Sequence, residues 1–89
     1  DTRKLLRDVL RSNASTAILA HNHPTGPALP SATDQLTTLK IMQLLAPAGI
    51  SILDHIIVAG ENACSMADRG RLPDISAHPG ILNAASTDF

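Results

Sequence analysis

The sequence contains almost no aromatic residues. It has no Trp and no Tyr, and its single Phe is Phe89. The hydrophobic core must therefore be built from aliphatic side chains, and binding of nucleic-acid bases by aromatic stacking is disfavoured. The formal net charge of −1 also gives no general attraction for phosphate backbones. We therefore expect no nucleic acid among the partners of this segment.

Cysteine and long apolar runs are scarce as well. The one cysteine, Cys64, cannot form an internal disulfide and fits a reducing compartment, so we expect a cytoplasmic protein. No stretch approaches the roughly 18 consecutive apolar residues of a membrane-spanning helix, and the first residues are not typical of a signal peptide. The 89 residues lack an initiator Met and open in a helical pattern, so we expect them to be part of a longer protein.

Helical and strand patterns alternate along the chain. Their order is a helix over 2–12, a strand over 16–20, a helix that starts after Ser31 and stops before Pro47, a strand over 50–59, and a short strand over 63–66 that follows a turn. This order indicates an α/β layered domain whose sheet is covered by helices. We assign residues 1–72 to that domain, with one helical turn at 67–72, and residues 73–89 to a weakly ordered tail.

Two histidines and an acid frame the proline-rich stretch between the first strand and the second helix. His21 and His23 continue directly from the strand, and alternate residues of an extended chain point to the same side. Asp34 falls in the first turn of the next helix, whose start the crossover brings near the strand end. Two imidazoles and one carboxylate suit Zn²⁺, with the fourth position left to water, although Ni²⁺ and Co²⁺ are alternatives. Ser31 would lie beside that water.

These residues also have simpler interpretations. Ser31-x-x-Asp34 is a common helix-capping arrangement, and a lone His-x-His pair in a loop usually binds nothing. Capping and metal binding can coexist, because a carboxylate has two oxygens. His55 lies in the middle of the strand over 50–59, where alternation places it on the face of Leu53 and Ile57. We expect it to be a buried, hydrogen-bonded structural histidine, with support of the metal site as the alternative.

The spacing matches a known signature. His21-x-His23, seven residues, Ser31, two residues and Asp34 follow the H-x-H-x7-S-x2-D core of the JAMM metalloprotease motif of MPN-type domains. More specifically, "ILAHNHPTG" and "GISILDHIIVAGENACSMADRGRL" resemble the RadC family of bacterial proteins, over about residues 3–72. The resemblance implies a layered MPN-type (cytidine-deaminase-like) α/β domain with a mixed sheet flanked by helices, whose first strands this chain lacks.

The resemblance also implies a function, that of a zinc-dependent metallohydrolase cleaving peptide or isopeptide bonds. In such an enzyme His21, His23 and Asp34 would hold Zn²⁺, and Ser31 would stabilise the oxyanion of the tetrahedral intermediate. The general base of JAMM enzymes is a glutamate on a strand upstream of the histidines. The only glutamate here is Glu61, downstream in a predicted turn. We therefore expect these 89 residues to bind metal but to lack activity alone.

A different class of function fits the same residues. The domain would then be a non-catalytic, metal-binding interaction module in a DNA-repair or recombination assembly. The upstream glutamate is the feature that discriminates the two functions. A sheet edge left open by the missing strands would also allow self-association.

Overall fold

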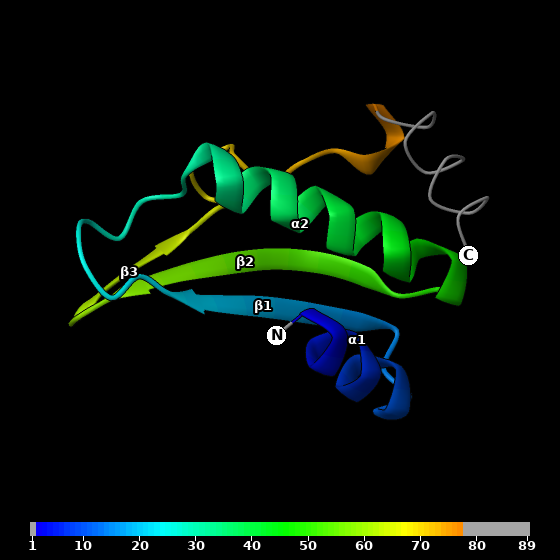
Figure 1. The fold of residues 1–89 in the computed structure, drawn as a ribbon. Helices are drawn as coiled ribbons and strands as arrows, with labels where there is room; N and C mark the ends of the chain where they lie inside the picture. Colours follow the sequence, from blue (N-terminus) through cyan, green and yellow to red (C-terminus); the bar gives the residue numbers. More distant parts are fainter. Residues whose placement is uncertain (1, 78–89) are drawn as a thin grey trace.

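The computed structural model describes residues 2–77, and within them helices and strands alternate in the predicted order (Figure 1). The elements are α1 (Thr2–Arg11), β1 (Thr16–Asn22), α2 (Ala32–Leu45), β2 (Ser51–Ala59) and β3 (Asn62–Ser65), with 3₁₀ turns at Ala46–Ala48 and Ile75–Ala77. β1 continues to Asn22, beyond the predicted end at residue 20, so it includes His21. Neither helix in residues 2–77 is long and apolar enough to cross a membrane.

The strands form one mixed sheet in the order β1-β2-β3. β1 and β2 are parallel and are connected through α2, whereas β2 and β3 are antiparallel and are connected by a tight turn. Figure 1 shows α2 lying along the sheet and α1 beside β1. This arrangement confirms the predicted α/β class and its mixed sheet with packed helices.

Within residues 2–77, the hydrophobic core between the helices and the sheet contains no Phe, Tyr or Trp side chain. Its buried members are Leu19, Ile41, Met42, Leu45, Ile50 and Ile52, and the partly buried side chains of α1 that pack against them are Leu5, Leu6 and Val9. Full burial of one such side chain contributes about 1.5–3 kcal/mol. Since α1 has no fully buried residue, it adds less to stability than α2.

A β-bulge in β2 changes which side chains share a face. The register shifts between Ala17 and Ile18, and Leu53 is left without a partner on β1. The extra residue reverses the alternation at that point. Leu53 is therefore 54% exposed, while His55 and Ile57 are buried. The expectation that Leu53 shares a face with His55 is wrong, because a bulge cannot be read from a continuous apolar run.

The chain after β3 forms turns. Residues 66–70 are a run of turns closed by a hydrogen bond from Arg71 N to Met66 O (2.8 Å), in place of the helical turn predicted at 67–72. Ile75, in the second 3₁₀ turn, packs against the core. The remainder of the predicted tail, including His78, lies outside the described residues.

Asp54 connects β2 by hydrogen bonds to the end of β3 and the chain that follows it. Its Oδ1 accepts hydrogen bonds from His55 N (2.7 Å) and Ala67 N (2.9 Å), and its Oδ2 accepts one from the Ser65 hydroxyl. Burial alone would raise the pKa of Asp54, but the hydrogen bonds from Ser65, Ala67 and His55 outweigh it and hold the pKa below its usual range. The ionised carboxylate is therefore the form that stabilises this corner.

Replacement of Asp54 by Asn should make the free energy of unfolding change less as the pH is lowered into the acid range. Because the pKa is lower in the folded state, the stabilisation is present above about pH 4 and is lost as the pH falls through the folded-state pKa. We expect Asp54→Asn to lower the free energy of unfolding by about 1–2 kcal/mol at pH 7, with a smaller difference below pH 4. Urea unfolding of metal-free protein at both pH values measures this.

Asp8→Asn is the matched control for Asp54→Asn. Asp8 forms an exposed ion pair with Lys4 on α1 (2.8 Å), and exposed pairs of this kind contribute little to stability. A loss in Asp54→Asn that is equal at neutral and acid pH, or no larger than the loss in the control, would contradict the role given to Asp54.

Candidate metal centre

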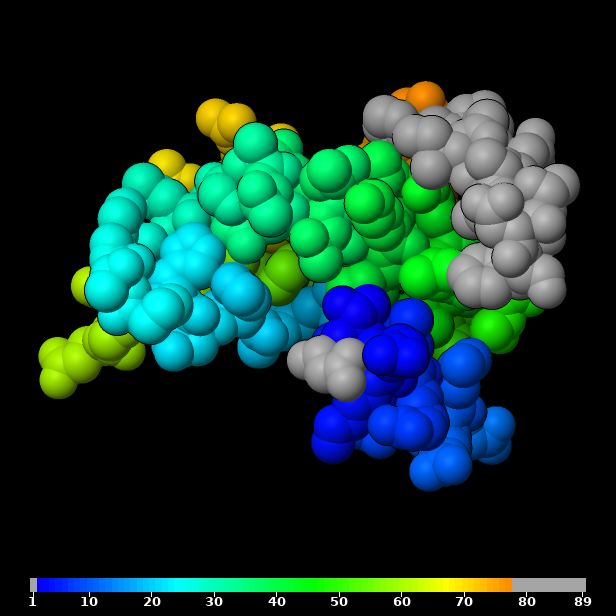
Figure 2. Space-filling model, in the orientation of Figure 1, coloured from blue at the N-terminus to red at the C-terminus, as the bar shows by residue number. Residues whose placement is uncertain are grey.

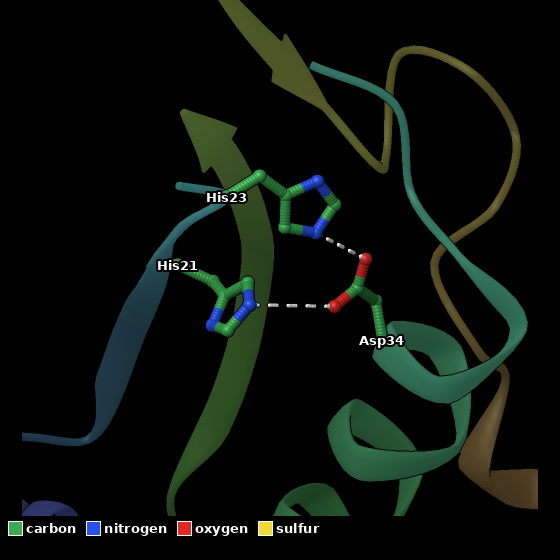
Figure 3. Close-up of side chains that lie close together, drawn as sticks. All are labelled: His21, His23 and Asp34. Atoms are coloured by element: carbon green, nitrogen blue, oxygen red, sulfur yellow. Dashed lines mark hydrogen bonds and ion pairs between the residues drawn. The ribbon is translucent and has the colours of Figure 1, made fainter. Parts of the chain in front are cut away.

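His21, His23 and Asp34 lie together where the end of β1 meets the start of α2 (Figure 3). Nε2 of His23 is 3.0 Å from Oδ2 of Asp34, and Nε2 of His21 is 3.8 Å from Oδ1. The two imidazole rings meet edge to face, with their centroids 5.1 Å apart. The structure thus brings the three predicted side chains to one point.

Strand geometry directs both histidines to that point. Alternate residues of a strand project from the same face, and His21 is on β1. His23 follows the end of β1, but its backbone N–H donates to Val58 O on β2 (2.7 Å), which keeps the backbone extended. The prolines of residues 24–30 then exclude regular structure until α2 begins.

A backbone carbonyl fixes the orientation of His23. Nδ1 of its ring lies 3.3 Å from Pro27 O, and a carbonyl oxygen can only accept a hydrogen bond, so Nδ1 carries a proton and donates. Nε2 of the same ring is 3.0 Å from Oδ2 of Asp34; a carboxylate oxygen only accepts, so this hydrogen bond needs a proton on Nε2, which a metal ion bound at Nε2 would replace. Orientation of a histidine by a carbonyl on its other nitrogen is the usual arrangement of metal-binding histidines.

Asp34 caps α2 and also faces both histidines. Asp34 N donates to the Ser31 hydroxyl (3.0 Å), and Ser31 N donates to Oδ2 of Asp34 (2.8 Å), which together form a capping box. Burial alone would raise the pKa of Asp34, but the hydrogen bonds from Ser31 and the interaction with His23 outweigh it and lower the pKa. Asp34 is therefore a carboxylate at neutral pH, and its Oδ1 stays directed to His21.

Ser31 lies at the helix start beside this group. It is exposed, and its hydroxyl oxygen accepts the hydrogen bond from Asp34 N. Accepting uses an oxygen lone pair and leaves the hydroxyl proton as a donor for another partner. The stabilisation of an oxyanion by Ser31 stays a prediction.

The three side chains fit a metal ion with nitrogen and oxygen ligands. One ligand atom from each lies within 4.8 Å of the others. A tetrahedral zinc ion with bonds of about 2.0–2.1 Å holds its ligand atoms about 3.3–3.4 Å apart. The distances of 3.0 and 3.8 Å join the two imidazoles to different oxygens of Asp34, so a tetrahedral ion bound by one of these oxygens needs the three side chains to move closer together. Asp34 supplies the negative charge that favours a cation.

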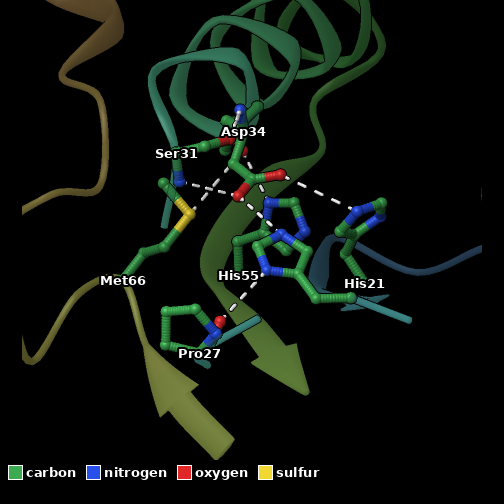
Figure 4. Close-up of polar contacts among 8 residues, drawn as sticks. His21, Pro27, Ser31, Asp34, His55 and Met66 are labelled. Carbon is green, nitrogen blue, oxygen red and sulfur yellow. Dashed lines mark hydrogen bonds and ion pairs between the residues drawn. The ribbon is translucent and has the colours of Figure 1, made fainter. Parts of the chain in front are cut away.

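His55 lies next to the candidate metal centre (Figure 4), where it contacts the buried Thr38. Nδ1 of His55 is 2.6 Å from Oγ1 of Thr38, which donates to the backbone carbonyl of Asp34 (2.6 Å). The prediction of a buried, hydrogen-bonded His55 is confirmed. Burial lowers its pKa; the charges of Asp34 and Asp54 oppose this effect, and those of His21 and His23 add to it. His55 is therefore neutral at physiological pH.

Sequence reasoning missed two groups of this centre, Thr38 and the carbonyl of Pro27. Thr38 is four residues after Asp34, the spacing that places two side chains on one face of a helix, so a signal for it was present. A backbone carbonyl leaves no signal in residue type.

Two other residues considered from the sequence lie elsewhere. Glu61 is exposed in the β2–β3 turn, which projects from the body of the molecule in Figure 2. Cys64 is a partly buried free thiol on β3, outside the His21, His23 and Asp34 group. Neither contributes to the candidate metal centre.

Comparison with known proteins identifies the family. A family model described as the RadC-like JAB domain matches residues 1–71. The chain belongs to the RadC-like JAB domain family. It is 48% identical over 68 residues to a UPF0758 protein of Pseudoalteromonas translucida, and 50% identical over 68 residues to one of Bordetella avium. A third UPF0758 protein, of Bordetella petrii, is 49% identical over 70 residues.

This RadC-like domain spans only part of its curated relatives. The matches cover 76–79% of this chain but 30–31% of the three relatives. Membership confirms the resemblance to RadC proteins, and the mixed sheet with its two helices agrees with the α/β class expected for such a domain. The names of the relatives state no activity.

Proposed function

We propose that this chain is part of a zinc-dependent hydrolase that cleaves peptide or isopeptide bonds. The observation that carries the proposal is the convergence of two imidazoles and an ionised carboxylate, all three on a RadC-like JAB domain. The orientation of His23 by Pro27 O supports it, because a proton held on Nδ1 leaves Nε2 as the nitrogen that can bind a metal.

In this proposal His21, His23 and Asp34 hold the metal, and Ser31 acts on the substrate. Zinc held in this way lowers the pKa of water toward neutrality and polarises a carbonyl group. The Ser31 hydroxyl donates a hydrogen bond to the substrate carbonyl oxygen as negative charge develops there. The capping box holds Ser31 in place for this task, since its oxygen and its backbone N–H are both bonded to Asp34.

The general base belongs, in this proposal, to a part of the protein outside this chain. Asp34 is engaged as a ligand, and Glu61, the one glutamate of the sequence, is exposed in a projecting turn. The relatives are about three times longer than the matched segment, which leaves room for a further acid. That acid would take the proton of the attacking water and deliver it to the leaving amine.

Replacement of Asp34 by Asn should separate metal binding from helix capping. Asn keeps an oxygen that can accept from Ser31 N, so the helix content should be unchanged, but it is a neutral and poorer metal ligand. Loss of a partner that only orients a metal ligand lowers metal affinity about 10- to 100-fold. Because Asp34 is itself a ligand in this proposal, we expect zinc affinity to fall by at least that much. Zinc titration against a chelating dye and circular dichroism measure the two effects.

Asp68→Asn is the control for this experiment. Asp68 is an exposed acid in the turns after β3, so its loss changes the net charge equally but leaves the centre intact. Full zinc affinity in Asp34→Asn, with loss of helix, would show that Asp34 only caps α2.

Hydrolysis should require more than these 89 residues. We expect the full-length protein, loaded with zinc, to cleave isopeptide or peptide substrates, and the isolated 89 residues to do so about 10²–10⁴-fold more slowly because a general base is missing. Ser31→Ala in the full-length protein should reduce kcat by about 10²–10³-fold with unchanged zinc content. A panel of fluorogenic substrates, assayed with and without chelator, measures these rates.

The outcomes distinguish the two classes of function. Zinc-dependent turnover by the 89 residues alone would show that the general base is a group within them, and Glu61 would be the first candidate. A full-length protein that binds zinc and cleaves no member of the panel would favour the non-catalytic, metal-binding interaction module.

A further inference from the structure

Thr38 and His55 form a polar contact inside the interface between α2 and β2. Thr38 is 0% exposed and His55 is 5% exposed. A buried hydroxyl or imidazole is costly unless it is hydrogen-bonded, and here the two groups are hydrogen-bonded to each other at 2.6 Å. The contact therefore holds this part of α2 at a fixed position on β2.

The direction of each hydrogen bond follows from the number of protons. Thr38 has a single hydroxyl proton, which it donates to the carbonyl of Asp34. Its oxygen must then accept, so Nδ1 of His55 donates to Thr38. The chain of donors runs from β2 through Thr38 to the backbone of Asp34.

His55 also contacts the other side of the metal centre. Leu19 of β1 pairs with His55 of β2, and His21 pairs with the next inward-facing residue of β2, Ile57. The rings of His21 and His55 meet edge to face with centroids 6.2 Å apart. His55 thus reaches Asp34 through Thr38 and touches His21 directly.

The two halves of the centre are not held equally well. The capping box and His23 fix the Oδ2 side of Asp34, at 2.8 and 3.0 Å. Oδ1 and His21 are 3.8 Å apart, and nothing bonds them directly at hydrogen-bond distance. The separation of Oδ1 from His21 depends on how closely α2 lies against the sheet. The Thr38–His55 contact holds α2 against β2 one helical turn after Asp34.

We propose that Thr38 and His55 are positioning residues, whose hydrogen bond sets the separation of Asp34 from His21 and thereby the affinity of the centre for zinc. The inference rests on the proposed zinc binding and goes beyond it, since neither residue is a ligand. A contact of purely structural value would change the stability of the fold and leave the metal affinity of the folded protein unaltered.

Three variants of the full chain test this inference. Thr38→Val removes the hydroxyl at nearly constant shape, Thr38→Ser retains it, and Leu45→Ala destabilises the far end of α2, where Leu45 is buried in the core. Zinc dissociation constants are measured by dye competition under conditions in which circular dichroism shows each variant folded. The visible absorption spectrum of the Co²⁺-loaded proteins reports the coordination geometry.

We expect Thr38→Val to weaken zinc binding about 10- to 100-fold and to alter the Co²⁺ spectrum. Thr38→Ser should restore affinity and spectrum, and Leu45→Ala should bind zinc as wild type does despite its lower stability. If Thr38→Val does not fold, His55→Asn, which retains an N–H donor near the position of Nδ1, takes its place and should bind zinc more tightly than His55→Leu.

Failure of the positioning role can be distinguished from failure of the proposed zinc binding. Equal zinc affinity in Thr38→Val and wild type, or equal losses in Thr38→Val and Leu45→Ala, would overturn the positioning role. Absence of zinc binding by wild type would overturn the proposed function itself.

Discussion

Asp34 carries a negative charge into a nearly buried position at the start of α2, where its side chain is 8% exposed. A buried carboxylate is costly unless hydrogen bonds and opposite charge compensate it. Here the backbone N–H of Ser31, the positive end of the helix dipole and the imidazole of His23 do so. Since Ser31 opens α2 and His23 extends β1, this one carboxylate fixes the helix start against the strand end.

The candidate metal centre is therefore organised by the fold before any ligand arrives. Prolines in residues 24–30 restrict the connection between β1 and α2, and Pro27 additionally supplies the carbonyl that orients His23. Thr38 and His55 hold α2 against β2 from within the core. Groups that are already ordered lose little conformational freedom on binding a cation. This favours binding through His23 and Asp34, whereas His21, with a half-exposed side chain 3.8 Å from Oδ1, is held less firmly.

The sequence alone was sufficient for the order of elements and for the convergence of His21, His23 and Asp34, because strand alternation and the helix start depend on local spacing and the strand-to-helix crossover brings the two ends near each other. The bulge at Leu53 could not be predicted, since strand register depends on pairing with β1. The partners of His55 and His23 were also missed. One is a hydroxyl brought close by packing, and the other is a backbone carbonyl.

The ligand set is the central claim, and X-ray absorption at the zinc edge of the metal-loaded protein tests it most directly. The structure leads us to expect nitrogen and oxygen neighbours at about 2.0–2.2 Å, no sulfur, and the outer-shell scattering of two imidazoles. That imidazole signal should be lost in a His21→Ala, His23→Ala variant. A sulfur neighbour at about 2.3 Å, which only Cys64 or a methionine could supply, or a zinc ion without imidazole, would contradict the account.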